Sequence, residues 1–435
     1  MHDSALATSP SLDWLLGFSD ATRGVGWNAR SNPSLEWNLR RTRVLLDLLG
    51  RPDRRLAIVL VAGTKGKGST AALLASLLAA SGVRAGLYTK PHLQSYRERI
   101  RVDGEIISMA DLDKGIAGLR PPLRAMRRHI PTAGQPTTFE LTTALALAHF
   151  AATGCAVAVV EVGLGGRFDA TNATDPHISV ITPISHDHMR ELGTSLGQIA
   201  WEKAGVLRPG RIAIVARQDA TVARVLRKAA RSVAAAPREI SPLSATVAKR
   251  YGLALRGAHQ RQNAALAIAA SRALAEHGVP FREQAIGRGL RQLRWPGRFE
   301  LMPGRPPIVL DGAHNDGSAK ALAVAIGAEL HGRRVRLIIG MMNDKDARAV
   351  VRALEPIASA GYVTRPDSPR AANPGEIARL FHRVPVRAFD DLASALDAAR
   401  ADARIGETLC VTGSLALVGQ ARELLGLPVA ARLWD

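Results

Sequence analysis

Cysteine and aromatic residues are scarce in this sequence. Only two cysteines occur among 435 residues, Cys155 and Cys410, and both lie in apolar segments typical of buried strands. Such a composition excludes a disulfide-rich scaffold, and we expect reduced thiols and a cytoplasmic protein. Aromatic residues make up 4% of the chain, which leaves few stacking platforms for single-stranded nucleic acids.

Long apolar runs and a basic leader are also missing. No stretch is long and uninterrupted enough to predict a membrane span. The opening segment MHDSALATSPSLDWLLGFSD lacks the basic and apolar regions of a signal peptide, so we expect no membrane association. A hydrophobic content of 47% and a charged content of 22% are typical of globular proteins, and the length allows two or three domains.

Acidic residues are outnumbered by basic ones, 38 against 58, which gives a net charge of +20. A basic balance can indicate nucleic-acid binding, but here the arginines are scattered and no helix-turn-helix, zinc-finger or RNP motif occurs. We therefore predict a basic surface that attracts anionic substrates such as ATP, and no nucleic acid as partner. A nucleic-acid-binding P-loop protein is the alternative from another class, and salt-dependent binding of random DNA would favour it.

Glycine and lysine are concentrated in VAGTKGKGST, residues 61–70. A β-branched apolar run precedes this segment, and an Ala/Leu-rich helical pattern follows it as far as Gly82, which predicts a strand-to-helix turn. The strict pattern G-x-x-x-x-G-K-[ST] is not met, because Gly68 separates Lys67 from Ser69. Backbone N–H groups and the helix N-terminus still favour phosphate, with Lys67 on the phosphate and Ser69 on Mg²⁺. The alternative is a glycine-rich turn with solvated lysines.

Strand and helix patterns alternate along the chain, which predicts an α/β fold with doubly wound parallel sheets. Strands are predicted at 55–63, 82–89, 155–166, 177–185 and 211–217, and helices at 35–50, 69–82, 109–119, 138–154, 195–207, 222–235 and 259–278. The segments 90–108 and 121–138 are predicted as loops, and 237–260 as short strands.

Proline and glycine crowd the segment RWPGRFELMPGRPP, where we place a domain boundary. Residues 1–297 form the first predicted domain, and residues 298–435 form a smaller Rossmann-like domain with a second βα series. Ligands bind such sheets at the carboxyl ends of the strands. The polar residues at these strand ends are therefore the candidates for chemistry.

Glu161 ends a buried strand, and a carboxylate beside a phosphate-binding turn suits Mg²⁺; a partly exposed acid in a turn is the alternative. In SHDHMRELG two histidines flank Asp187, but a zinc site has little support without a further His or Cys at ligand spacing. One histidine in a Mg²⁺ site is the better functional interpretation. DGAHND, residues 311–316, is predicted to be a ligand loop, whereas Lys203 alone would be a solvated helix lysine.

Several segments in order resemble one family, folylpolyglutamate synthase/dihydrofolate synthase of the Mur ligase superfamily, from about residue 35 to about residue 425. They are VAGTKGKGST, YTKPHLQSYRERIRVDG, FELTTALALAHF, EVGLGGRFDATN, DHMRELGTSLGQIAWEKAG, HQRQNAALA, WPGRFE, LDGAHN, GMMNDKD and VTGSLALVG. The resemblance implies a P-loop-containing, Mur-ligase-like ATPase domain followed by a smaller Rossmann-like glutamate-ligase domain.

The resemblance also implies a reaction. ATP phosphorylates a carboxylate of dihydropteroate or a reduced folate, and the amine of L-glutamate attacks the acyl phosphate to give an amide, ADP and phosphate. ATP and Mg²⁺ are the implied cofactors, with a monovalent cation such as K⁺ as a further one, and a monomer is expected. The alternative is a paralogue of the same superfamily that joins an amino acid to another carboxylic acid.

Site residues follow from the matching motifs and remain implied by the resemblance. ATP phosphates would be held by Gly63, Thr64, Lys65, Gly66, Lys67, Gly68 and Ser69, and the nucleotide contacted by Asn263, Arg298 and Asp311. The metal would be bound by Ser69, Glu161, His188 and a carbamylated Lys203. Catalysis would use Lys67, Lys203 and His314, with Ser414 placing the glutamate or the acyl phosphate. The pterin side would meet Phe139, Glu140, Phe168, Asp169 and Ala170.

Two positions depart from the family pattern. Lys65 stands where many bacterial members have Asn, and lysine there is tolerated within the family. Lys90 stands where the family usually has a metal-binding Ser before Pro-His-Leu. A protonated lysine offers only donors, so it cannot ligate a metal. Our hypothesis is that the Lys90 ammonium takes over part of the metal's role beside Glu161 or a phosphate; Thr89 as the hydroxyl donor, or a solvent-facing Lys90, are the alternatives.

Overall fold

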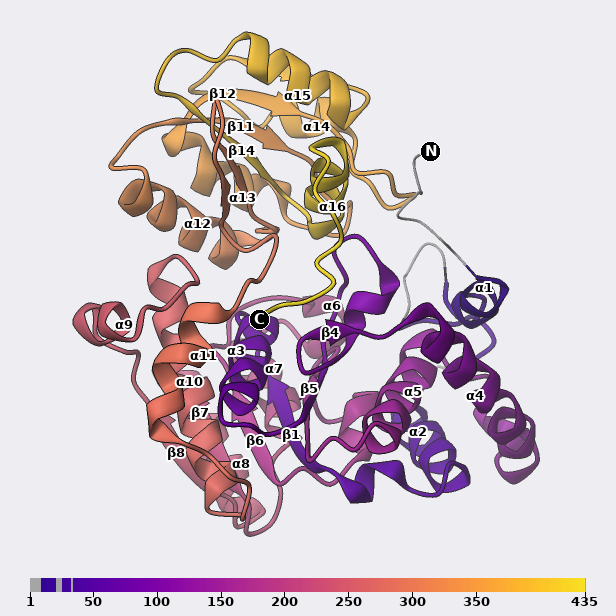
Figure 1. The fold of residues 1–435 in the computed structure, drawn as a ribbon. Coiled ribbons are helices and arrows are strands. Elements are labelled where there is room, and N and C mark those ends of the chain that lie inside the picture. The colour runs from indigo at the N-terminus through magenta and orange to yellow at the C-terminus, as the bar shows by residue number, and fades with distance from the viewer. Residues whose placement is uncertain (1–8, 21–25, 33, 435) are drawn as a thin grey trace.

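The computed structural model describes residues 9–20, 26–32 and 34–434, and its two sheets each carry helices on both faces (Figure 1). The first sheet has the order β4-β3-β2-β5-β1-β6-β7-β8. Its strands are β1 (Ala57–Ala62), β2 (Ala85–Tyr88), β3 (Ile100–Val102), β4 (Glu105–Ile106), β5 (Val157–Glu161), β6 (Ile178–Ile181), β7 (Ile212–Ala216) and β8 (Ala236–Ile240). All pairings are parallel except those of β3 with β2 and β4.

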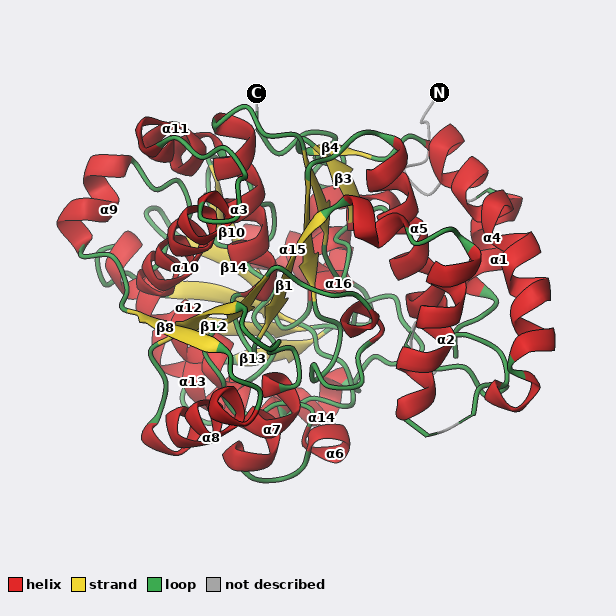
Figure 2. Cartoon of the chain, turned by 90° about the horizontal axis from the view of Figure 1, so that it is seen from below, coloured by secondary structure: helices red, strands yellow, loops and turns green. Residues whose placement is uncertain are grey.

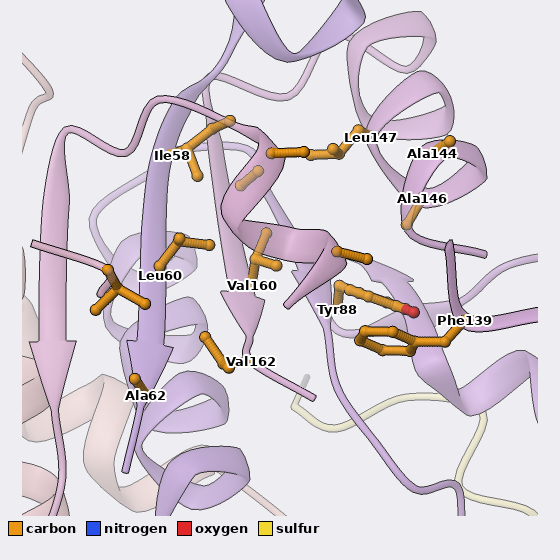
Figure 3. Packing of buried hydrophobic residues seen from close by; sticks show 14 of the residues in the cluster. Ile58, Leu60, Ala62, Tyr88, Phe139, Ala144, Ala146, Leu147, Val160 and Val162 are labelled. Atoms are coloured by element: carbon orange, nitrogen blue, oxygen red, sulfur yellow. The ribbon is translucent and has the colours of Figure 1, made fainter. Parts of the chain in front are cut away.

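Alternate residues of β1 pack on opposite faces of this sheet, as expected for a strand buried on both sides. Ile58, Leu60 and Ala62 join one apolar cluster with α2, α4, α5, α7 and α8 (Figure 3), and Val59 and Val61 join another with α3, α10 and α11. The helices are α1 (Pro10–Leu16), α2 (Glu36–Leu48), α3 (Lys67–Ala80), α4 (Met109–His129), α5 (Thr138–Ala152), α6 (Met189–Leu192), α7 (Leu196–Ala204), α8 (Ala220–Ser232), α9 (Ala245–Tyr251), α10 (Ala258–Ala275) and α11 (Ile286–Gln292).

The second sheet has the order β13-β12-β11-β14-β10-β9, parallel except for the β9–β10 pair. Its strands are β9 (Glu300–Met302), β10 (Ile308–Leu310), β11 (Val335–Ile339), β12 (Ala358–Val363), β13 (Val386–Ala388) and β14 (Thr408–Thr412). Its helices are α12 (Asp316–Glu329), α13 (Ala347–Leu354), α14 (Pro374–Ala378), α15 (Leu392–Ala401) and α16 (Leu415–Leu424), which cover both faces (Figure 2). The predicted α/β fold is confirmed; the boundary at residue 298 stays a prediction.

Short 3₁₀ turns complete the chain: η1 (Pro52–Arg55), η2 (Tyr96–Arg99), η3 (Pro131–Ala133), η4 (Ala170–Ala173), η5 (Glu283–Ala285) and η6 (Glu355–Ile357). Within the described part of the chain, no helix combines the length and apolar character that crossing a bilayer requires.

Three predicted segments are wrong in part. The loop predicted from residue 121 is helical as far as His129, because Leu123 and Met126 continue the apolar face of α4 into the core, which offsets the usual penalty of Pro121 and Pro122. Part of 237–260 is the helix α9 rather than strand, with Ser244 capping its start through the Val247 N–H. The loop predicted at 90–108 contains η2, β3 and β4.

The C-terminal tail, residues 428–434, leaves α16 and returns to the first sheet (Figure 1). The Ile106 N–H donates to the Ala431 carbonyl at 2.9 Å, and the Leu433 N–H donates to the Gly104 carbonyl at 3.2 Å. Leu433 and Trp434 are buried in the cluster formed by α3, α10 and α11. The tail therefore ties the second sheet's last helix to the first sheet.

Candidate functional site

The glycine-rich turn between β1 and α3 has a conformation that only glycine allows at two positions. Gly63 has φ of 137°, and a Cβ atom there would lie 1.9 Å from Thr182 Oγ1. Gly66 has φ of 79°, and its Cβ would lie 2.3 Å from the Oδ1 atom of Asn263, a buried residue of α10. Because α3 begins directly after this turn, its first N–H groups have no partner inside the helix and can bind an anion.

Not every N–H of the turn is available. The Thr64 and Lys65 N–H groups donate to the Pro183 carbonyl at 3.0 and 3.3 Å, and the Thr64 hydroxyl bonds the backbone of Ser185. These bonds fix the turn to the end of β6. The N–H groups from Gly66 onward are therefore the ones that the geometry offers to phosphates.

Glu161 borders the first turn of α3. It ends β5 opposite Val61 in the sheet register and is 5% exposed. Its Oε2 atom accepts the Lys90 N–H at 3.1 Å and lies 3.2 Å from the place where a Cβ on Gly68 would be. The Glu161 carboxylate therefore lies beside the first turn of α3, which also carries the buried Ser69.

Three lysines converge on the same region. Lys203 is buried, not solvated, and its Nζ donates to the Gly63 carbonyl at 2.9 Å. Burial, with help from Lys67 and Lys90, lowers the pKa of Lys203 to about 7. Burial and Lys67 likewise lower the pKa of Lys90 to about 8 against the attraction of Glu161. Cations held this close favour an anionic ligand between them.

His188 lies in the segment that follows β6, directly before α6, in a left-handed conformation with φ of 50°. Its imidazole lies 3.9 Å from an Asp187 carboxylate oxygen and 4.0 Å from one of Glu191. Partial burial lowers the pKa of His188 to about 3 against the attraction of Asp187, and Lys345 and Lys90 add to the lowering. The ring is therefore neutral at physiological pH, which is the form that binds metals.

A polar chain joins the glycine-rich turn to the second sheet. Lys65 Nζ donates to Asn315 Oδ1, and Asn315 Nδ2 donates to Asp187 Oδ2 at 2.9 Å. Lys345 Nζ lies 3.9 Å from the other Asp187 oxygen. Burial opposes the charge on Asp187, but His188, Lys65 and Lys345 outweigh it and hold the pKa of that carboxyl at about 2.

Asp311 follows β10 and organises its own loop. Its two carboxylate oxygens accept the Phe299 and Ala313 N–H groups at 2.8 and 2.9 Å. Burial raises the pKa of Asp311, against the attraction of Arg298 and these two N–H groups. Arg298 is also attracted by Glu161 of the first sheet, so it lies between the two sheets, where the nucleotide contact is predicted.

His314 and Ser414 lie at the ends of neighbouring strands of the second sheet. His314 Nδ1 is 2.8 Å from the Gly312 carbonyl, and burial lowers the pKa of the imidazole to about 4. The Ser414 hydroxyl accepts the Leu417 N–H at 3.1 Å and so caps α16. His314 therefore stabilises the loop after β10, and Ser414 stabilises the start of α16, in addition to any role toward a ligand.

The residues predicted for the pterin side divide into two groups. Phe139 stacks on Tyr88 with ring centroids 6.1 Å apart (Figure 3), and a Cβ on Gly163 would lie 2.6 Å from the Phe139 ring and 2.8 Å from Asp169 Oδ2. Phe139 and Asp169 are thus brought together, with the buried Ala170 next to them. Phe168 instead lines a separate pocket.

Glu140 is placed apart from that group. It is 1% exposed, and its carboxylate binds Arg41 through two bonds of 2.7 Å. Thr137 adds a bond of 3.2 Å to the same carboxylate. The side chain is therefore committed to a buried ion pair, and a direct contact with a substrate would have to break this pair.

Sequence reasoning gave no individual role to Lys345 or Trp295, and it included Asn315 only as part of the predicted ligand loop 311–316. Trp295 lies 3.6 Å from the place of a Gly68 Cβ, and its buried indole N–H has no partner among the described residues. All three lie inside segments that carried the family resemblance, LDGAHN, GMMNDKD and WPGRFE, and this was the available signal. Among the residues that the structure describes, no three His, Cys, Asp or Glu side chains gather into a ready-made metal cage.

The chain is similar to known proteins over most of its length. Residues 61–241 match the Mur ligase middle domain, and residues 297–415 match the Mur ligase, glutamate ligase domain. The Dihydrofolate synthase/folylpolyglutamate synthase of Bacillus subtilis is 32% identical over 411 residues, covering 89% of this chain and 94% of that protein. The Probable bifunctional folylpolyglutamate synthase/dihydropteroate synthase of Haloferax volcanii is 36% identical over 406 residues, and this chain spans 47% of its length.

A solved structure shows the same arrangement. Mycobacterium tuberculosis Folylpolyglutamate synthase complexed with ADP matches with a TM-score of 0.84 and 34% identity, covering 92% of this chain and 96% of that one. Identity above 30% over about nine tenths of both chains indicates membership of one family. The chain belongs to the dihydrofolate synthase/folylpolyglutamate synthase family of Mur ligases.

Proposed function

We propose that this protein is an ATP-dependent ligase that adds L-glutamate to the carboxylate of a pteroate or folate through an acyl phosphate. One observation carries the proposal: the phosphate-binding turn faces Glu161 on one side and Asn315 of the second sheet on the other. An anion held at the turn is therefore within reach of residues from both sheets. ATP is the nucleotide, in keeping with the ADP in the M. tuberculosis relative.

The chain's own residues supply positioning and charge. Phosphoryl transfer to a carboxylate needs charge neutralisation more than covalent help. The N–H groups from Gly66 onward and Lys67 hold the phosphates, and Lys90 and Lys203 add positive charge around the transferred group. The carboxylate oxygen attacks the γ-phosphorus, ADP leaves, and the amine of glutamate then displaces phosphate from the acyl carbon.

The residues present fit a Mg²⁺ ion. Glu161 is buried beside α3, its Oε2 atom accepts one backbone N–H, that of Lys90, and the first turn of α3 carries the buried hydroxyl of Ser69. Magnesium in phosphate sites takes one or two carboxylates and completes its shell from phosphates and water, so no larger protein cage is needed. Ser69, Glu161 and neutral His188 would hold it, and the ion would neutralise charge on the phosphates. Use of K⁺ stays a prediction.

Lys203 is proposed as a carbamate. A protonated lysine has no lone pair to offer a metal ion, whereas a lysine carbamate is a carboxylate-like ligand. Lys203 is 5% exposed and reaches the Gly63 carbonyl, so its end lies at the turn itself. Enzyme equilibrated with ¹³C-bicarbonate should show a carbamate carbon resonance that is missing in Lys203→Arg. A spectrum identical for the two proteins would exclude the modification.

We propose separate positions for the pterin end of the substrate and for the incoming glutamate. The pterin is proposed to lie near Phe139, Asp169 and Ala170, and the glutamate near His314 and Ser414. Arg298, Asp311 and Asn263 are proposed to contact the nucleotide. The domains are proposed as residues 1–297 and 298–435, in a monomer whose mass light scattering can check.

The experiment is phosphate release from ATP with Mg²⁺ and L-glutamate, given dihydropteroate or a reduced monoglutamyl folate in separate reactions. Release with dihydropteroate alone identifies a dihydrofolate synthase, release with the folate alone a tail-extending synthase, and release with both a bifunctional enzyme. No release in either reaction, with ATP still bound, would contradict the proposal and favour the paralogue that uses another carboxylic acid.

Lys90 gives a separate prediction. Lys90 is half-buried, and Glu161 and Asp169 attract its ammonium, so it neutralises charge that a metal would otherwise neutralise. We expect Lys90→Ser to lower turnover about tenfold at limiting Mg²⁺ and to recover at high Mg²⁺, because removing one close charge weakens the site by roughly 1–2 kcal/mol. Manganese titration followed by electron paramagnetic resonance should show an added or tighter ion in the variant.

The matched control is Lys228→Ser on the exposed face of α8. It removes the same charge far from the turn and should leave turnover and manganese binding unchanged. The hypothesis fails if Lys90→Ser keeps the wild-type Mg²⁺ dependence, turnover and ion stoichiometry.

A further inference from the structure

The segment 90–95, which we call the Lys90 loop, joins the first sheet to the second. It follows β2, and at its start the Lys90 N–H donates to Glu161 Oε2 at 3.1 Å. Three residues later, the Leu93 side chain packs against an apolar cluster that includes strands of the second sheet and the helices α15 and α16. One short loop therefore connects the proposed metal side of the first sheet with the interior of the second.

Helix α16 approaches the Lys90 loop at Gly419 so closely that no side chain fits between them. A Cβ atom on Gly419 would collide with the Leu93 carbonyl oxygen and would lie 3.0 Å from its carbonyl carbon. Gly419 lies inside α16 and is not among the glycines with positive φ, so its backbone does not require glycine. Because alanine favours a helix more than glycine does, the contact with the loop explains the glycine.

Arg422, three residues after Gly419 in α16, holds the end of the same loop. It is buried, and its Nε atom donates to Gln94 Oε1 at 2.8 Å. Its two Nη atoms donate to Glu300 Oε1 and to the Pro428 carbonyl. Gln94 Nε2 donates in turn to the Leu427 carbonyl at 3.1 Å. Hydrogen bonds to a charged group are stronger than neutral ones, so this network fixes the side chain of Gln94 relative to α16.

The backbone of the Lys90 loop is held between these contacts. The Glu98 carboxylate accepts the N–H groups of Leu93, Gln94 and Ser95 at 3.2, 2.8 and 2.7 Å. Pro91 restricts its own backbone and that of the residue before it, which is Lys90. A displacement of the loop from α16 is therefore transmitted to Lys90.

We propose that α16 is the positioning element for Lys90 and acts on it through Leu93 and Gln94. The inference rests on the proposed function. While α16 contacts the loop, the Lys90 N–H occupies one oxygen of Glu161, and the ammonium stays where that carboxylate attracts it. When the contact is lost, the ammonium moves away and a further cation is needed in its place. Ser414, proposed to place the glutamate, caps the start of the same helix. One rigid element thus holds the glutamate position and Lys90 together.

Gly419→Ala tests the inference directly, because it inserts a methyl group against the loop while it favours the helix itself. The variant should behave as Lys90→Ser does. The Mg²⁺ concentration for half-maximal phosphate release should rise about tenfold, since one close charge is withdrawn. Manganese titration followed by electron paramagnetic resonance should show the same added or tighter ion as in Lys90→Ser. A mere loss of stability would lower the amount of active enzyme without changing the number or affinity of bound ions.

Gly327→Ala is the matched control. It makes the same change inside α12, where a Cβ atom meets nothing within 4 Å, and it should leave both measurements unchanged. Gly419→Ala combined with Lys90→Ser should shift the Mg²⁺ dependence no further than Lys90→Ser alone, because both changes remove the same ammonium from the site. Gln94→Met removes both hydrogen bonds of Gln94 without a collision and should give a smaller shift in the same direction.

Three results would overturn the inference. They are wild-type behaviour of both Gly419→Ala and Gln94→Met, full additivity of Gly419→Ala with Lys90→Ser, and wild-type behaviour of Lys90→Ser itself. Circular dichroism shows whether each variant is folded, and Gln94→Met decides if Gly419→Ala is not. Phosphate release is measured on wild type from the same preparation. An active wild type with unaffected variants refutes only the positioning role, whereas a wild type inactive with every folate refutes the proposed function.

Discussion

Gly63→Ala is expected to weaken ADP binding about a hundredfold. A Cβ atom at this position would lie 1.9 Å from Thr182 Oγ1 and 2.9 Å from the Thr182 carbonyl oxygen, in a backbone with φ of 137°. Strain of this kind and overpacking each cost roughly 1–3 kcal/mol, and 2.7 kcal/mol corresponds to a factor of about 100. The turn would move away from β6, and its N–H groups would no longer converge on the phosphates. Calorimetric titration with ADP measures the loss.

Gly82→Ala is the matched control for this change. Gly82 follows the C-terminal end of the same helix, α3, with φ of 83°, and a Cβ there meets nothing within 4 Å. The substitution carries backbone strain of about 1 kcal/mol but no collision, so stability should fall slightly while ADP affinity stays unchanged. Wild-type ADP affinity in Gly63→Ala would show that the turn does not hold the nucleotide.

Arg41→Met is expected to lower the free energy of unfolding by about 3–5 kcal/mol, because it leaves the buried Glu140 carboxylate without its partner. The two side chains are 0% and 1% exposed, and Arg41 donates to both carboxylate oxygens of Glu140 through Nε and Nη2, one edge of its guanidinium. Burial already raises the pKa of Glu140 against the opposing effect of Arg41, so the carboxyl in the variant would take up a proton more readily. Urea unfolding followed by circular dichroism gives the difference.

Two further variants make this prediction specific. Arg41→Met combined with Glu140→Leu removes both charges and should regain most of the lost stability. Arg238→Met breaks an ion pair whose side chains are 45% and 48% exposed, and it should cost less than about 1 kcal/mol. Equal losses for Arg41→Met and Arg238→Met would mean that burial does not determine the strength of the Arg41 pair.

Local patterns predicted the parts of the fold that depend on neighbours in the sequence. The apolar run of β1 and the glycines after it predicted the strand, the turn and α3, because each depends on residues a few positions apart. The extension of α4 past Pro121 could not be predicted, since it depends on packing against the core. Helix α9 had a readable signal in its Ser244 cap, which the short-strand interpretation overlooked.

The sequence predicted the positions of candidate residues that follow strands, but not the contacts between the two sheets. Glu161 and His188 follow strands, so sheet order alone places them near the turn. The contact of Lys65 with Asn315 joins residues 250 positions apart and depends on how the second sheet sits over the first. The same holds for Arg41 and Glu140, whose pairing explains why a residue next to Phe139 is not free for a ligand.

The tail contact has a consequence for the order of synthesis. Leu433 and Trp434 are buried in an apolar cluster with residues of α3, α10 and α11 and of strands β1, β2, β5, β6 and β7. During translation these helices emerge long before the tail, and the whole second sheet is made in between. The nascent chain therefore exposes part of this apolar surface until the tail has been made, and chaperones that recognise such surfaces can bind it during that interval.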